Sequence, residues 1–207
     1  MRKETYVYIV DDDPAVRESI SMLLGVANYK TVSFSSAKGF LEVCSDDMRG
    51  CVILDVDMPE MNGQRLQQEL LRRDIHLAII FLSGKGSIQM SANTIRAGAI
   101  DFLTKPVHGS VLLERVQEAL QHNVQLLMQV EACKIASHKL STLTQREREV
   151  MALTVEGHSS KEIAQLIGIS YRTVEIHRGH IMEKTGAKNL IELSQIRISA
   201  AKDHLIK

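Results

Sequence analysis

The stretch Val7-Tyr8-Ile9-Val10-Asp11-Asp12-Asp13-Pro14 leads from an apolar run into three acids and a proline. The same form, an apolar run that ends in polar residues, returns at Val52-Ile53-Leu54-Asp55, Ile80-Phe81-Leu82-Ser83 and Phe102-Leu103-Thr104-Lys105-Pro106. Short runs that are rich in Val, Ile and Leu and bounded by turn residues are typical of buried strands. Functional groups gather at the carboxyl ends of strands in open α/β sheets, so these acids, a hydroxyl and a lysine are predicted to surround one crevice.

Helical patterns alternate with these runs. A further strand is predicted at residues 30–34, and helices are predicted at residues 14–25, 36–44, 63–73 and 88–97. Strand–helix alternation implies a parallel sheet that helices cover on both faces. The first half of the chain is therefore predicted to be a doubly wound α/β domain.

Three acids are expected to meet at one edge of this sheet. Asp11, Asp12 and Asp55 would repel one another there unless a cation lies between them. Mg²⁺ suits such a site, because it takes one or two carboxylates, keeps waters and reaches a phosphate oxygen. Asp13 and Pro14 also suit the N-cap and the first position of a helix, so the first run alone has a simpler interpretation as a solvated cap. The polar ends of the other runs favour a site for Mg²⁺ and a phosphoryl group.

The segment Leu54-Asp55-Val56-Asp57-Met58-Pro59-Glu60-Met61-Asn62-Gly63 resembles the phosphorylation loop of two-component receiver domains, and the resemblance covers residues 5–120. It implies a flavodoxin-like, doubly wound, five-stranded parallel sheet with five helices. The roles it assigns are the phosphoacceptor for Asp55, a metal-binding acid pair for Asp11 and Asp12, and a metal-ligating backbone carbonyl for Asp57.

The other matched positions imply how a phosphoryl group would act. They assign the switch hydroxyl to Ser83, the switch aromatic residue to Phe102, and the phosphate-pairing lysine to Lys105, which in this family often precedes a cis proline. When Asp55 attacks a phosphoryl group in line, Mg²⁺ and the lysine are expected to offset the charge on its oxygens. The hydroxyl then donates to the phosphate and the aromatic ring turns inward, as parts of a two-state element. Lys85 and Asp57 flank the site, and we hypothesise that they tune the lifetime of the acyl phosphate.

The second half of the chain shows no strand-like run from residue 141 onward. Its helix signals are a capping box of Thr144 and Glu147, a second capping box of Ser159 and Glu162, a stop at Gly168 and an N-cap at Ser170. Two short helices joined by three residues indicate a helix-turn-helix, whose second helix enters a DNA groove. Plain helix packing is the alternative interpretation of such a pair.

The amino-acid sequence of residues 140–200 resembles the LuxR-type DNA-binding domain. The matching segments are Leu143-Thr144-Gln145-Arg146-Glu147-Arg148-Glu149-Val150, Lys161-Glu162-Ile163-Ala164, Thr173-Val174-Glu175-Ile176-His177-Arg178 and Ile181-Met182-Glu183-Lys184. Together the two halves resemble a response regulator of the FixJ type.

A recognition helix is then expected at residues 171–184. The side chains that suit phosphate contacts, which position the protein without specifying sequence, are Lys161, Arg172, Thr173 and Lys184. The side chains expected to face the bases are Glu175, Ile176 and Arg178, with cytosine for the acid and guanine for the arginine. Gly179 lacks a side chain for base reading.

Charge predicts that one copy binds DNA weakly. Residues 141–207 hold ten Lys and Arg against eight Asp and Glu, which leaves a charge of 10 − 8 = +2. Phosphate neutralisation supplies much of the affinity for DNA, and two linked domains bind far better than one. We therefore expect a homodimer on phosphorylation, with a sensor histidine kinase, double-stranded DNA and RNA polymerase as the other partners.

The domains are predicted at residues 1–121 and 141–207, with a helical linker at 122–140. The linker has two interpretations, a disordered tether after an ordinary last helix or one long helix that pairs with a second copy. No apolar run approaches the ~20 residues of a membrane helix. Three widely spaced cysteines and the absence of a signal peptide indicate the cytoplasm.

Three functions fit these features. The first is a phosphorylation-switched transcription regulator, which is not an enzyme beyond its own phosphorylation and dephosphorylation. The second is a receiver whose helical half binds protein or RNA, and the LuxR-like recognition helix argues against it. The third is a Mg²⁺-dependent phosphatase, which the lack of a second set of catalytic acids disfavours.

Overall fold

The computed structural model describes residues 4–84 and 88–206. The chain divides into two compact units, Met1–Leu127 and Met128–Lys207. Among the described residues of the first unit, five strands form one parallel sheet in the order β2-β1-β3-β4-β5. The strands are β1 (Tyr6–Val10), β2 (Thr31–Phe34), β3 (Gly50–Asp55), β4 (Ala78–Ser83) and β5 (Asp101–Thr104). The predicted strands and the doubly wound fold class are confirmed, with small shifts at the ends of the elements.

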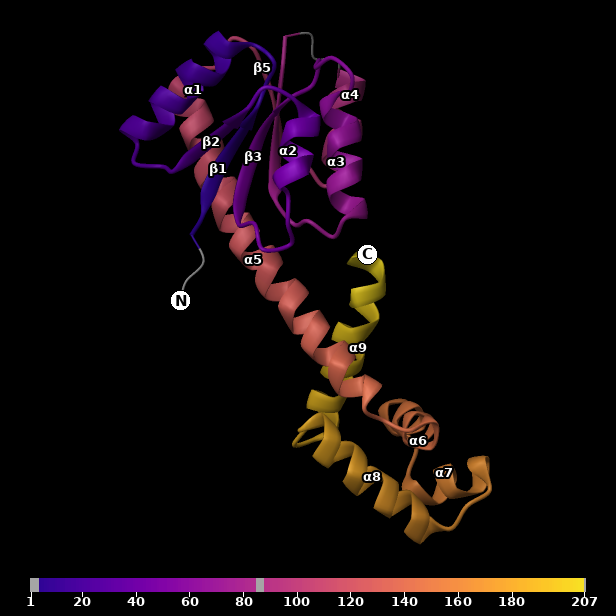
Figure 1. Ribbon diagram of the computed structural model, residues 1–207. Coiled ribbons are helices and arrows are strands. Elements are labelled where there is room, and N and C mark those ends of the chain that lie inside the picture. The colour runs from indigo at the N-terminus through magenta and orange to yellow at the C-terminus, as the bar shows by residue number, and fades with distance from the viewer. Residues whose placement is uncertain (1–3, 85–87, 207) are drawn as a thin grey trace. The chain divides into compact units, whose positions relative to one another are not determined.

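Helices cover both faces of this sheet (Figure 1). They are α1 (Pro14–Val26), α2 (Ala37–Val43), α3 (Gly63–Arg72), α4 (Ile88–Arg96) and α5 (Gly109–Ser141). One buried cluster joins side chains of α1 and α5 to the sheet, and the cluster on the other face holds side chains of α2 and α3. The central strands β3 and β4 are buried along their whole length, because helices cover them on both sides.

The strand register brings the polar strand ends to one edge. Val10 pairs with Leu54, Asp55 pairs with Leu82, and Ser83 pairs with Thr104. All four strands run in the same direction, so the residue after β1 and the last residues of β3, β4 and β5 lie at the same end of the sheet. Asp13 caps α1 through its side chain and Pro14 opens that helix, as predicted.

The helix α5 is continuous over 33 residues, in agreement with the long-helix interpretation of the linker. A buried asparagine fastens it to the amino-terminal edge of the sheet. Asn123 accepts a hydrogen bond from the backbone N–H of Gly50 at 2.9 Å and donates one to the carbonyl of His76 at 2.6 Å. These bonds satisfy backbone groups that would otherwise be costly to bury.

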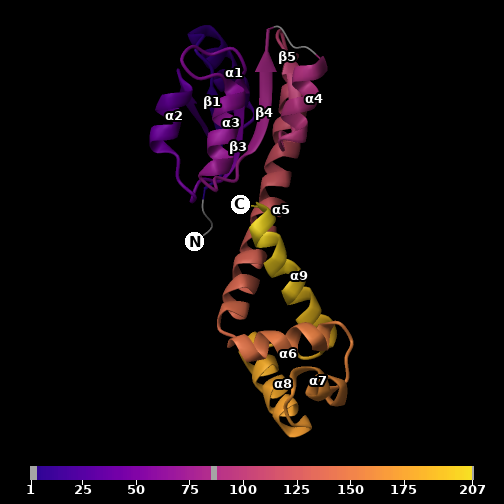
Figure 2. The same cartoon turned by 90° about the vertical axis from the view of Figure 1, so that its right-hand side faces the viewer.

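The second unit contains α6 (Gln145–Val155), α7 (Ser160–Ile167), α8 (Tyr171–Thr185) and α9 (Leu190–Ile206). Figure 2 shows α6, α7 and α8 grouped together. Both predicted capping boxes are present, and Gly168 ends α7 in the left-handed conformation at φ 68°. The turn between α7 and α8 completes the predicted helix-turn-helix. No helix within residues 4–84 and 88–206 is both long and apolar enough to cross a membrane.

Candidate functional site

Two buried carboxylates share one lysine at the carboxyl end of the sheet. Asp11 follows β1 and is 1% exposed, and Asp55 ends β3 and is 5% exposed. Lys105, which follows β5, places its Nζ 2.6 Å from Asp11 Oδ2 and 2.7 Å from Asp55 Oδ1. Asp12 and Asp57 are exposed beside them, and together these five residues form what we call the acid pocket.

Backbone donors hold the second oxygen of each buried carboxylate. The N–H of Asp13 donates to Asp11 Oδ1 and the N–H of Asp57 donates to Asp55 Oδ2, both at 2.9 Å. Arg17 on α1 donates from Nη1 to the backbone carbonyl of Asp11 at 2.7 Å. The carboxylates therefore keep fixed orientations, and the loop after β1 is held against α1.

Negative charge exceeds positive charge in the acid pocket. Burial raises the pKa of Asp11 above its ordinary value, against the hydrogen bond from Lys105. Burial lowers the pKa of Lys105, but its bonds to Asp11 and Asp55 outweigh this effect and leave that pKa raised. One ammonium faces two buried and two exposed acids, so the pocket lacks positive charge.

The donor set fits Mg²⁺, which prefers carboxylate and carbonyl oxygens together with waters. Four acids and the backbone carbonyl of Asp57 supply only oxygen atoms, and an open depression lined by Asp55, Asp57, Gly84 and Lys105 gives access. In the part of the chain that the structure describes, no three acidic, His or Cys side chains converge as a metal cluster. The ammonium of Lys105 lies between the two buried acids instead.

The two predicted switch residues lie beside the acid pocket. Ser83 is fully buried at the end of β4, and its carbonyl accepts the N–H of Lys105 at 2.8 Å. Phe102 is half-buried in β5, with its ring centroid 6.3 Å from that of Phe81. The Lys105-Pro106 bond is cis, as the family resemblance implied. Lys85, expected to flank the site, lies outside the described residues.

Two contributors were missed by sequence reasoning. Arg17 carried no signal beyond its place on the first turns of α1, near the acids. Gly63 belongs to the loop quoted above, yet its role depends on packing. A Cβ there would lie 2.3 Å from the carbonyl oxygen of Asp55, so only glycine lets α3 begin so close to β3.

The helix-turn-helix presents a second candidate site. Lys161, Arg172 and Glu175 are exposed, and Ile176 is 50% exposed. Thr173 is half-buried, and its backbone N–H donates to the N-cap oxygen of Ser170 at 3.0 Å. The first turns of α8 thus present polar groups and the side chains of Tyr171 and Ile176 to solvent.

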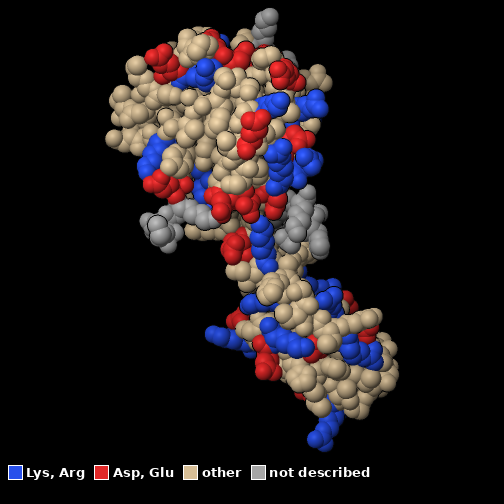
Figure 3. Space-filling view, viewed as in Figure 1, with Lys and Arg blue, Asp and Glu red and all other residues tan. Residues whose placement is uncertain are grey.

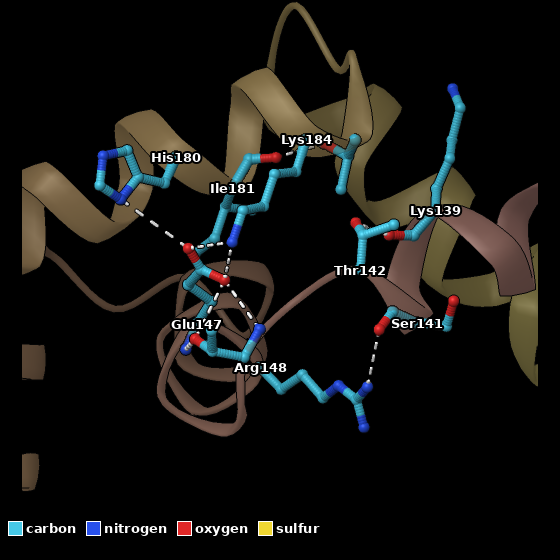
Figure 4. Close-up of polar contacts among 10 residues, drawn as sticks. Lys139, Ser141, Thr142, Glu147, Arg148, His180, Ile181 and Lys184 are labelled. Atoms are coloured by element: carbon cyan, nitrogen blue, oxygen red, sulfur yellow. Dashed lines mark hydrogen bonds and ion pairs between the residues drawn. The ribbon is translucent and has the colours of Figure 1, made fainter.

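The basic side chains of Arg178 and Lys184 on α8 bind within the protein. Arg178 donates from Nη1 to the hydroxyl oxygen of Ser160 on α7 at 2.7 Å. Lys184 places Nζ 2.8 and 2.7 Å from the two carboxylate oxygens of Glu147 on α6 (Figure 4). Lys184, expected to contact DNA phosphate, therefore already has an anionic partner that sequence reasoning did not foresee.

Glu147 is the centre of this second buried contact. Its side chain is only 4% exposed, and it accepts the backbone N–H of Thr144 at 2.8 Å, as a capping box requires. The hydrogen bond from Lys184, followed by those from Thr144, outweighs desolvation and lowers the pKa of Glu147 to about 2. His180 Nδ1 lies 3.8 Å from the same carboxylate. We call these four residues the α6–α8 clamp.

The face shown in Figure 3 carries both signs of charge on each unit. On the face shown in Figure 3, Lys and Arg side chains are interspersed with Asp and Glu over both units. This mixture agrees with the charge of +2 counted for residues 141–207.

Family comparisons match both halves of the chain. Residues 7–117 match the family described as response regulator receiver domain. Residues 141–196 match the family described as bacterial regulatory proteins, luxR family.

Named transcriptional regulators align with this chain over most of their length. The chain is 44% identical to the transcriptional regulatory protein TdiR of Thauera aromatica over 90% of this chain and 82% of that protein. It is 36% identical to the transcriptional regulatory protein FixJ of Azorhizobium caulinodans over 94% and 92% of the two chains.

Solved structures agree with these matches. The structure of the response regulator StyR covers 94% of this chain and 98% of its own, with 35% identity and a TM-score of 0.76. Full-length FixJ from B. japonicum covers 96% and 98% of the two chains, with 30% identity and a TM-score of 0.57.

Proposed function

This chain belongs to the response regulators that join a receiver domain to a LuxR-family DNA-binding domain, and from that premise we propose that phosphorylation of Asp55 controls its binding to specific DNA sequences. A protein of this family is a phosphorylation-dependent transcription regulator and not a catalytic enzyme. The finer proposal is that a sensor histidine kinase supplies the phosphoryl group. The observation that supports phosphorylation of Asp55 is the acid pocket, where two buried carboxylates share one lysine.

Asp55 is the proposed nucleophile. One of its carboxylate oxygens bonds to phosphorus as the bond from phosphorus to the donor breaks, and the donor leaves with those electrons. The N–H of Asp57 holds Oδ2 and Lys105 holds Oδ1, so the carboxylate is oriented before the donor arrives. Lys105 then pairs with an oxygen of the transferred group, because its ammonium already lies at the carboxylate.

Mg²⁺ is the proposed cofactor. The carboxylates of Asp11, Asp12 and Asp55 and the carbonyl of Asp57 would hold it, and it would neutralise charge on the phosphoryl oxygens. Asp11 is well placed for this, because Arg17 and the N–H of Asp13 fix its backbone and one of its oxygens.

Ser83 and Phe102 are the proposed switch. The acyl phosphate adds negative charge and acceptor oxygens beside the end of β4. The hydroxyl of Ser83 donates to one of them, which draws the strand end toward Asp55. Phe102 on the neighbouring strand then packs further inward, next to Phe81. A local electrostatic event thereby biases the face built by α4, β5 and α5.

The second unit is proposed to bind double-stranded DNA through α8. Lys161, Arg172 and Thr173 contact phosphates, and all three lie at the amino-terminal ends of α7 and α8. Glu175, Ile176 and Arg178 face the bases. Lys184 acts in this proposal by holding α8 against α6 through Glu147, rather than by meeting phosphate directly.

Phosphorylated copies are proposed to pair through α4, β5 and α5. The proposed helical linker, residues 122–140, lies within α5, so paired receivers bring two DNA-binding domains together, where they recruit RNA polymerase. Sedimentation velocity with and without a small phosphodonor tests the pairing. A fully phosphorylated protein that stays monomeric and still binds its operator more tightly contradicts it.

The central experiment measures intact mass after incubation with a small phosphodonor and Mg²⁺. The wild type gains one phosphoryl group, chelation blocks the gain, and Asp55→Asn shows none. Asp46→Asn is the matched control, because that exposed aspartate lies outside the acid pocket. The same samples are then titrated with operator DNA, and only the labelled ones bind more tightly. Labelling that persists in Asp55→Asn rejects the assignment.

A further inference from the structure

A serine at the start of α7 joins two side chains of the recognition helix. Ser160 is the first residue of α7 and is only 6% exposed. Its hydroxyl donates to Glu175 Oε1, and its oxygen accepts from Arg178 Nη1 at 2.7 Å. A hydroxyl carries one donor and two acceptor lone pairs, so both bonds exist at the same time.

The two partners lie one turn apart on the same side of α8. Residues three apart on a helix are surface neighbours, so Glu175 and Arg178 meet at the hydroxyl of Ser160. A carboxylate and a guanidinium are thereby tied to one point on another helix. A hydrogen bond between a charged and a neutral group is stronger than one between two neutral groups. The bonds to Ser160 therefore favour these rotamers of Glu175 and Arg178 over others.

The side chain of Arg178 is also partly enclosed by neighbouring residues. It lines a small cavity whose other walls are Thr154, Ile181, Met182, Leu190 and Leu193. The arginine is half-buried, whereas Glu175 is exposed at the surface of α8. Ser160 holds the guanidinium of a side chain that is already half-buried, which limits the rotamers of Arg178.

The side chain of Ser160 is buried, in contrast to that of the next residue, Lys161, which is exposed. A direct phosphate contact is therefore an inferior explanation for a serine at this position. The N-cap of α7 is already supplied by Ser159, so capping does not explain Ser160 either.

We propose that Ser160 is a positioning residue for sequence reading, which sets the orientation of Glu175 and Arg178 before α8 enters the groove. The inference rests on the proposed DNA reading by α8 and adds the residue that preorganises it. Side chains ordered in the free protein cost less to order on binding. Sequence preference should therefore depend on a hydroxyl that touches no base.

The test compares base preference among full-length phosphorylated variants by selection from a randomised duplex library. Ser160→Ala is expected to lose about 3- to 10-fold in preference at the base positions that Glu175 and Arg178 specify. Affinity for random duplex and its salt dependence stay unchanged. Ser199→Ala on α9 is the matched control and keeps the wild-type preference. Ser160→Thr retains the hydroxyl and is expected to keep most of the wild-type base preference.

A double-mutant cycle separates positioning from a general effect on folding. In a Glu175→Ala/Arg178→Ala background, Ser160→Ala is expected to change base preference no further, because its partners are absent. An equal loss in both backgrounds overturns the inference, as does an unchanged preference in Ser160→Ala. A wild type with no base preference at all overturns the DNA-reading proposal and this inference together.

Discussion

The acid pocket and the α6–α8 clamp both bury carboxylates against a lysine, yet they differ in balance. In the acid pocket Lys105 is shared by Asp11 and Asp55, which are 1% and 5% exposed. In the clamp Lys184 gives both of its close contacts to the single carboxylate of Glu147. The acid pocket therefore has excess negative charge, whereas in the α6–α8 clamp one lysine balances one carboxylate.

The pKa values move in opposite directions for this reason. Burial raises the pKa of Asp11, and the shared lysine does not compensate fully. Hydrogen bonds from Lys184 and Thr144 lower the pKa of Glu147 to about 2. A buried carboxylate–lysine pair indicates a binding site only where negative charge remains uncompensated. A balanced pair has no excess charge with which to bind a cation.

The largest expected effect separates the two lysines. Lys105→Met should slow phosphorylation of Asp55 by about 10²–10³-fold, because it removes the preorganised ammonium that would stabilise the charge on the transferred phosphoryl group. Lys184→Met makes the same chemical change in the α6–α8 clamp and should leave the phosphorylation rate at the wild-type value. Rates are followed by intact mass over time with a small phosphodonor. Equal slowing in both variants would mean that Lys105 supports only the fold.

The second prediction concerns the stability of the clamp. Glu147→Gln should lower the free energy of local opening of α6 and α8 by about 2 kcal/mol, since it removes a buried charge that pairs with Lys184. Hydrogen exchange read by mass spectrometry measures this helix by helix. Glu149→Gln is the control, because that side chain is 42% exposed and pairs on the surface with Arg146. Protection equal to wild type in Glu147→Gln would show that the clamp adds no stability.

The third prediction is a pH dependence of the same helices. The folded-state pKa of Glu147 lies below the ordinary 4.5, so its contribution is complete above about pH 4.5 and is lost as the pH falls toward 2. The free energy of local opening of α6 and α8 should fall by about 1–2 kcal/mol over this range, a modest amount because water screens the partly exposed Lys184. The difference in hydrogen exchange between wild type and Glu147→Gln should shrink over that range. A difference that stays constant with pH contradicts the lowered pKa.

The smallest expected effect tests the two lysines on DNA. Lys161→Ala should weaken binding to all duplexes alike and reduce the slope of log affinity against log salt by about 1. Lys184→Ala should leave that slope unchanged, because its charge is already matched by Glu147. Binding isotherms at several salt concentrations decide between them. A reduced slope in Lys184→Ala would restore Lys184 as a phosphate contact.

Short-range patterns made the fold predictable from the sequence. Apolar runs ending in polar residues predicted the strands and their functional edge, since chain direction alone places those ends together in a parallel sheet. Capping boxes at Thr144 and Ser159 predicted where α6 and α7 begin, because the bonds involved span three residues. The family resemblance added roles for the residues at these positions.

Only the tertiary structure decided which groups share a partner. Lys105 meets acids that lie 94 and 50 residues away in the chain, and Lys184 meets Glu147 over 37 residues. Ser160 joins residues 15 and 18 positions further on. Such contacts depend on how packed helices and strands place side chains within about 3 Å of each other, a distance that no local pattern encodes. The sequence by itself determined the elements and the chemistry at their ends, and packing determined the charge balance of each site.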